Sequence, residues 1–124
     1  MTGDAQVLLG RAEALLNAPD SAAAGNAARL AAFLARQAVE DLIDARCAAL
    51  CEAPADSGTT KAKLAILKSM DTTRAGPVLI AAWHQLTGHC HQHAYQLSPT
   101  VSEVREQCLA VRQHCLGQQS EPAE

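Results

Sequence analysis

The chain has very few aromatic side chains, and this scarcity limits how its core can be built. One Trp, one Tyr and one Phe make up 2% of the 124 residues, whereas 48% of the residues are hydrophobic. The core must therefore consist mainly of leucine, alanine, valine and isoleucine. Alanine is the strongest helix former, and β-sheets favour the aromatic side chains that are scarce here. The composition therefore predicts an all-α fold.

Three other features are missing, and each absence excludes a class of protein. The net charge of −3 disfavours an extended contact with duplex nucleic acid, which requires clustered Lys and Arg. No apolar run approaches the roughly 18 residues that a membrane span requires, so we expect no membrane contact. The first residues lack the basic and apolar regions of a signal peptide. We therefore expect a cytoplasmic protein whose five cysteines are reduced thiols.

Apolar residues recur at helical spacing in five segments, which loop-forming residues separate. The predicted helices run from Asp4 to Asn17, from Ala22 to Glu52, from Thr59 or Thr60 to Met70, from Pro77 to Leu97 and from Thr100 to Gly117. Short connections predict antiparallel neighbours, so the expected fold is an up-and-down antiparallel bundle of four to five helices. We expect a single domain over residues 1–124, with a frayed tail from residue 118.

Some positions carry more specific predictions. Thr100 and Glu103 match a capping box at the start of the last helix, and Arg36 can pair with Glu40 on the exposed side of the second helix. A core-facing seam is predicted on the last helix, formed by Val101, Val104, Cys108, Val111 and Cys115. The three lysines are expected on a solvated helix face; they are Lys61, Lys63 and Lys68.

Most of the residues able to do chemistry lie in the stretch HCHQHAY, residues 89–95. Each residue advances about 100° around a helix, which puts His93 on the apolar stripe of the fourth helix and His89 at its edge. His84, His91 and Tyr95 fall on the opposite, more polar side. A histidine on an apolar stripe is either a core residue bonded to a neighbouring helix or a cleft residue suited to general acid–base chemistry. Both interpretations stay open.

A metal site is a further alternative. His89 and His93 are four residues apart on one helix, as are Cys47 and Cys51 on another, and two such pairs can supply four ligands. However, neither a His-Glu-x-x-His nor a Cys-x-x-Cys motif is present, so we assign no metal ligands and expect no cofactor. Cys47 and Cys51 are expected toward the polar side of their helix, as the more reactive thiols. Core positions are expected for Cys90, Cys108 and Cys115.

Two stretches together resemble the HEPN superfamily of small helical bundles. Residues 33–42 are similar to the family's helix with a Gln-Ala-x-Glu core, here Gln37 to Glu40, and residues 93–95 are similar to the His-x-Tyr end of its Arg-x(4–6)-His signature. The resemblance covers residues 26–117. It implies a homodimer in which Arg and His of two protomers meet in a cleft and cleave RNA. It makes His93 and Tyr95 the candidate catalytic residues, and His89, Gln37 and Glu40 the candidate binding residues.

The arginine of the family signature has no counterpart in this chain. Leu86, Thr87 and Gly88 occupy the positions in question, and none of them can hold a phosphate as a guanidinium does. We therefore expect a module that binds a nucleotide, RNA or a partner protein, such as a nucleotidyltransferase or an antitoxin, at a dimer-interface cleft near His93. The alternatives are a degenerate, metal-independent ribonuclease of toxin–antitoxin type and a metal-binding helical bundle. The sequence leaves open whether the protein is an enzyme.

Overall fold

The computed structural model describes residues 2–17, 24–51, 58–90 and 100–116. Within these ranges the chain forms only helices: α1 (Thr2–Leu16), α2 (Ala24–Cys51), α3 (Thr60–Met70), α4 (Ala75–Cys90), α5 (Val101–Val111) and a π-helical turn, η2 (Arg112–Leu116). This confirms the predicted all-α fold class. None of the described helices is long and apolar enough to cross a membrane.

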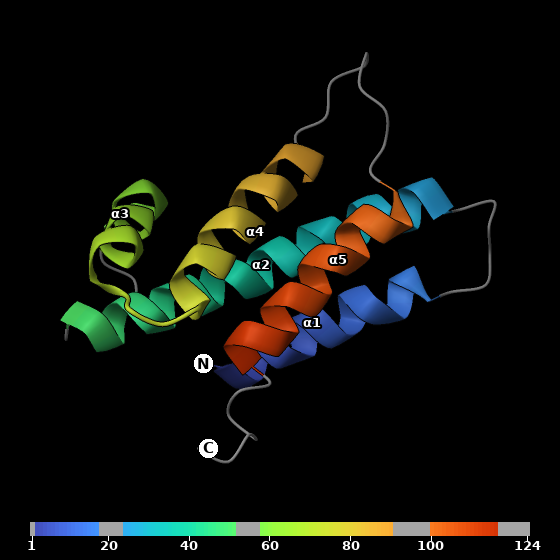
Figure 1. The fold of residues 1–124 in the computed structure, drawn as a ribbon. Coiled ribbons are helices and arrows are strands. Elements are labelled where there is room, and N and C mark those ends of the chain that lie inside the picture. The colour runs from blue at the N-terminus through green and yellow to red at the C-terminus, as the bar shows by residue number, and fades with distance from the viewer. Residues whose placement is uncertain (1, 18–23, 52–57, 91–99, 117–124) are drawn as a thin grey trace.

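Helix α2 is the axis of the molecule, and it contacts each of the other α-helices. Helices α1, α2, α4 and α5 alternate in direction along the chain, as the up-and-down prediction requires (Figure 1). The short helix α3 lies across the C-terminal end of α2, outside this alternation (Figure 1). Helices α1, α2, α4 and α5 therefore form the bundle, and α3 covers one end of it.

Small side chains allow the helices to approach each other closely. Five alanines on α2 have no exposed surface, namely Ala28, Ala31, Ala32, Ala35 and Ala38. On the facing side of α1, Ala5, Leu9 and Ala12 are also fully buried. The core is therefore built from alanine and leucine, as the composition predicts, while Phe33 is 46% exposed.

The helix ends follow local rules that the sequence makes visible. The Thr59 side chain accepts a hydrogen bond from the Ala62 amide at 3.1 Å, which caps the start of α3. Thr100 and Glu103 form the predicted capping box, with hydrogen bonds of 2.9 and 3.1 Å. The fourth helix starts at Ala75 rather than at Pro77. Its predicted continuation to Leu97 and the predicted tail from residue 118 lie outside the described residues.

Two predictions of exposure were wrong, because α3 covers the last turns of α2. Lys63 is buried rather than solvated, and its ammonium lies 2.7 Å from the carboxylate of Asp44. Cys47 is also buried, and its thiol donates a hydrogen bond to the Lys63 carbonyl oxygen at 3.3 Å. Cys51, Lys61 and Lys68 are exposed, as predicted.

The predicted seam of the last helix holds as far as Val111. Val104, Cys108 and Val111 are buried, but residues 112–116 form a π-helical turn. A π turn contains one residue more than an α turn. Leu116, five residues after Val111, is therefore buried, whereas Cys115 is only partly covered.

Candidate functional site on helices α2 and α4

The stretch of α2 that resembles the family helix divides its side chains between the core and the surface. Ala38 and Val39 are fully buried, whereas Phe33 and Gln37 are exposed. Glu40 lies at the boundary, where α2 packs against α4. Local helical periodicity therefore directs Glu40 toward α4 and Gln37 toward solvent.

Glu40 joins the two helices through one carboxylate oxygen. Its Oε2 atom accepts a hydrogen bond from Arg36 Nε at 3.1 Å and another from the indole Nε1 of Trp83 at 3.1 Å. The Arg36 guanidinium carbon lies 5.9 Å from the centre of the Trp83 ring, within the range of a cation–π contact. The predicted Arg36–Glu40 ion pair is confirmed, and it is half-buried beside an aromatic ring.

A second ring extends this group of residues. Trp83 and His84 pack edge to face, with centroids 5.4 Å apart and planes at 77°, and His84 is exposed as expected. We call Arg36, Glu40, Trp83 and His84 the α2–α4 cluster. Planar guanidinium and aromatic groups stack well against nucleobases. The arrangement therefore suits a flat, aromatic ligand better than a compact anion, because the Glu40 carboxylate repels negative charge.

An uncovered apolar surface lies on the outer side of α2. Leu30 and Phe33 are 49% and 46% exposed, one turn apart. Beside them, Arg11, Ala14, Leu15 and Leu34 line an open depression of about 380 Å³ between α1 and α2. We call Leu15, Leu30, Phe33 and Leu34 the outer apolar face. Exposed apolar groups that cluster in this way mark interaction surfaces.

Acidic side chains lie beyond this face on α2. Burial, followed by the neighbouring carboxylates of Asp44 and Asp4, raises the pKa of Asp41. Each of these two carboxylates disfavours ionisation of Asp41. A cation brought to this end of the surface would therefore relieve the repulsion.

The predicted site residues are only partly within the described structure. Glu40 belongs to the α2–α4 cluster, whereas Gln37 is exposed on α2 and is not a member of this cluster. His89 lies in the last turn of α4, and its side chain is outside the described residues, as are His93 and Tyr95. Their roles stay predictions.

The three positions that lack the family arginine differ in their surroundings. Leu86 is fully buried, and the Thr87 hydroxyl is buried without a hydrogen-bond partner in the described part of the chain. Gly88 is exposed, and a Cβ atom added there would meet nothing within 4 Å. Residue 88 is therefore the position of the three that accepts a long polar side chain without repacking.

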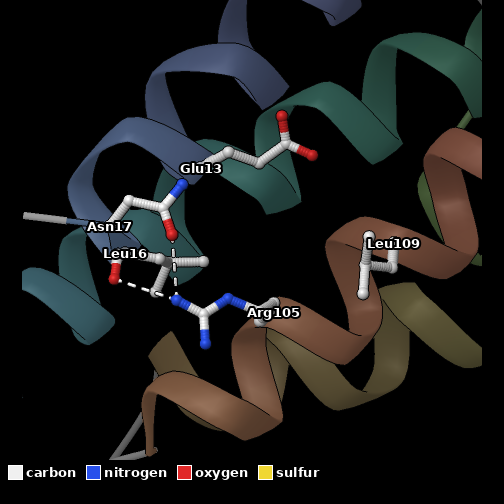
Figure 2. Close-up of a pocket in the computed structure, with 5 residues that line it drawn as sticks. All are labelled: Glu13, Leu16, Asn17, Arg105 and Leu109. Atoms are coloured by element: carbon white, nitrogen blue, oxygen red, sulfur yellow. Dashed lines mark hydrogen bonds between the residues drawn. The ribbon is translucent and has the colours of Figure 1, made fainter.

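A smaller pocket lies between α1 and α5 (Figure 2). Its volume is about 150 Å³, and it is lined by Glu13, Leu16, Asn17, Arg105 and Leu109. Arg105 Nη2 donates hydrogen bonds to the Leu16 carbonyl at 3.1 Å and to Asn17 Oδ1 at 3.0 Å. Glu13 accepts two hydrogen bonds from Arg112, at 2.8 and 3.0 Å. These polar groups therefore fasten α5 and the π-helical turn to α1.

No family model matches the chain. No curated protein and no solved structure matches it either. The HEPN resemblance therefore rests on the two short stretches of sequence.

Sequence reasoning missed Trp83 as a site residue, because a large apolar side chain at helical spacing also fits a core position. A partly buried indole needs an acceptor for its N–H group. Glu40 supplies it from 43 residues away. The presence of a single Trp in a chain with so few aromatics was the signal that could have identified it.

Proposed function

We propose that the chain is a HEPN-like homodimeric module that binds a nucleotide or single-stranded RNA on the surface shared by α2 and α4. The α2–α4 cluster carries this proposal, because Glu40 of the first family-like stretch is bonded to the helix that leads into the second. The first stretch therefore contributes directly to this surface, and the second stretch follows α4 in the sequence.

The chemistry of the cluster supports a ligand with a nucleobase. Trp83, His84 and Arg36 present planar groups beside one another, and stacking on such groups contributes about 1–3 kcal/mol per base. The proposal assigns phosphate contacts to His89 and His93, whose imidazoles carry charge when protonated. A net charge of −3 suits a short ligand better than a long duplex.

The outer apolar face supports a second copy of the chain as its occupant. In an isologous pair the same surface meets itself. Arg11 lies at the depression beside Leu34, and Asp41 follows Leu34 two turns later on α2. Antiparallel pairing around Leu34 would set this apolar surface against its own copy and leave the carboxylates around Asp41 about two turns from the axis, outside the apolar contact. The face is thereby complementary to itself in apolar surface.

Ligand binding can be measured directly, because Trp83 is the single tryptophan. We expect adenosine monophosphate or a short single-stranded RNA to change its fluorescence in a saturable way. Arg36→Ala should weaken binding about fivefold or more, since the base would lose a stacking contact worth about 1–3 kcal/mol. Arg105→Ala, in the pocket between α1 and α5, is the matched control and should bind as the wild type does. An unchanged fluorescence signal would refute nucleotide binding, and equal affinity for all three proteins would refute the α2–α4 cluster as the site.

Sedimentation equilibrium tests the dimer. Phe33→Asp should shift the protein to monomer, because a charge would be buried in the interface. Leu109→Asp is the control, since Leu109 is 55% exposed on α5, away from the outer apolar face. A monomeric wild-type protein, or equal dissociation of both variants, would contradict this interface.

The ribonuclease alternative has a separate test. Cleavage of several RNAs by the wild type, but not by His93→Ala, would support it. Gly88→Arg restores an arginine at the family spacing in a position with free space. If Gly88→Arg cleaves RNA and the double variant with His93→Ala does not, the likeness of residues 93–95 to the family signature reflects a catalytic role. Equal background cleavage by all of these proteins would exclude the enzyme.

A further inference from the structure

Three sulfur-bearing side chains lie on the last turns of α2 and at the end of α3. Cys47 and Cys51 are one turn apart on α2. The Cys51 Sγ atom lies 4.0 Å from Sδ of Met70, the last residue of α3. The Cys47 thiol also faces α3, because it donates to the Lys63 carbonyl. Two thiols and a thioether from two helices are thus directed to the same junction.

We propose that Cys47, Cys51 and Met70 form a binding site for a soft monovalent metal ion, Cu(I). Sulfur ligands bind a first-row metal at about 2.3 Å, so two sulfurs that share one trigonal ion lie about 4 Å apart. The observed distance of 4.0 Å between Cys51 Sγ and Met70 Sδ matches this value. Cys47 completes the set by rotating its thiol from the Lys63 carbonyl toward Cys51.

The type of ligand selects the metal. Thiolates bind both Cu(I) and zinc, but a thioether and a set of only three ligands favour Cu(I), because structural zinc takes four thiolate, imidazole or carboxylate ligands. No group of three or more His, Cys, Asp or Glu residues that could hold a metal occurs within the described ranges. The site therefore differs from the His–Cys site considered from the sequence, because it needs the thioether of Met70.

Exposure and charge are consistent with entry and binding of the ion. Cys51 is exposed and Met70 is 46% exposed, so an ion can reach them from solvent. A role as a ligand also accounts for the position of Met70, an apolar residue, outside the core. Binding releases two thiol protons, so that Cu⁺ and two thiols give an anionic Cu(I) dithiolate and two H⁺. Burial, followed by the charge of Cys51, raises the pKa of the Cys47 thiol, and the positive charge of Lys63 opposes that rise.

The experiment uses tag-free, fully reduced protein under nitrogen and Cu(I) supplied from a chromophoric chelator. Since Met1 and Met70 are the two methionines, protein labelled with ¹³C-methyl methionine gives two methyl signals. We expect one Cu(I) per chain and a shift of the Met70 methyl signal alone. Met70→Leu keeps the volume but removes the sulfur, and should weaken binding at least about tenfold. Cys51→Ser and Cys47→Ala should each weaken it further, while Cys115→Ser, a partly covered thiol elsewhere, should leave it unchanged.

Two results would overturn the proposal. If the Met70 methyl signal does not move on addition of one equivalent of Cu(I), the thioether is not a ligand. If Met70→Leu and Cys47→Ala both bind as tightly as the wild type, Cu(I) is held by an isolated exposed thiol. Circular dichroism of each variant confirms that it is folded. These outcomes are independent of nucleotide binding, because the sulfur site lies on α3 and the end of α2.

Discussion

Replacing Asp71 with asparagine should destabilise the protein by an amount that depends on pH. The Asp71 side chain has no exposed surface and sits directly after α3. Arg46 donates two hydrogen bonds to it, each of 3.1 Å, and the Thr73 amide and hydroxyl donate two more, of 2.9 and 2.7 Å. Asparagine keeps the shape of the side chain but removes the negative charge that pairs with Arg46.

The magnitude follows from the pKa of this carboxyl. Burial alone would raise the pKa of Asp71, but the hydrogen bonds from Arg46 and Thr73 outweigh burial and lower it from 3.8 to about 2. At 1.36 kcal/mol per pKa unit this difference amounts to about 2 kcal/mol. Because the folded-state pKa is the lower one, this stability is fully present above about pH 4 to 5. It is lost as the pH falls through about 2.

Urea unfolding followed by circular dichroism at pH 6 and pH 2 measures this contribution. We expect Asp71→Asn to lower the free energy of unfolding by about 2–3 kcal/mol at pH 6 and by less than about 1 kcal/mol at pH 2. Glu106→Gln, on the exposed side of α5, is the control and should have little effect at either pH. The same loss at both pH values would refute the electrostatic origin of the effect.

Four further substitutions test the fold. Gly76→Ala should destabilise the protein by about 1–3 kcal/mol in thermal or urea unfolding, since its Cβ would lie 3.0 Å from the Asp71 side chain. Gly10→Ala, where the added Cβ would meet open space, should stabilise the protein by about 0.5–1 kcal/mol. Equal effects of the two substitutions would contradict the close approach at Gly76. Thr100→Ala should lower the free energy of unfolding by about 1 kcal/mol, because it removes the capping box. An unchanged free energy would mean that the capping box does not stabilise the protein. Asp44→Asn should lower the free energy of unfolding by only about 1 kcal/mol, because this carboxylate is 36% exposed. The difference between wild type and variant should shrink in 1 M NaCl, which screens the charge of Lys63.

The local features of this fold were predictable from the sequence, because they depend on residues close together in the chain. The Thr100–Glu103 cap and the Arg36–Glu40 pair span three and four residues. Helical periodicity also identified the five helices and most of the buried positions. Each of these predictions used one helix at a time.

The contacts between helices were not predictable, because periodicity does not fix how each helix is rotated against its neighbours. The Trp83–Glu40 and Arg46–Asp71 bonds join residues 43 and 25 positions apart. The burial of Lys63 follows from the position of α3, which no pattern within α3 reveals. The π turn was missed because over so short a stretch the 3.6-residue period also accommodates a continued α-helix.

The way α3 is attached has a consequence for how the protein opens. Only Leu67 and Lys63 of its eleven residues are buried, and polar bonds supply much of its link to the bundle, notably Lys63 to Asp44 and Arg46 to Asp71. Segments with few buried apolar contacts open separately from the core. The amides of α3 should therefore exchange with solvent faster than those of α2, and first of all in acid. The α3 end of the molecule should therefore unfold locally while the bundle stays folded. An ion bound to the sulfur atoms of α2 and α3 would oppose this local unfolding.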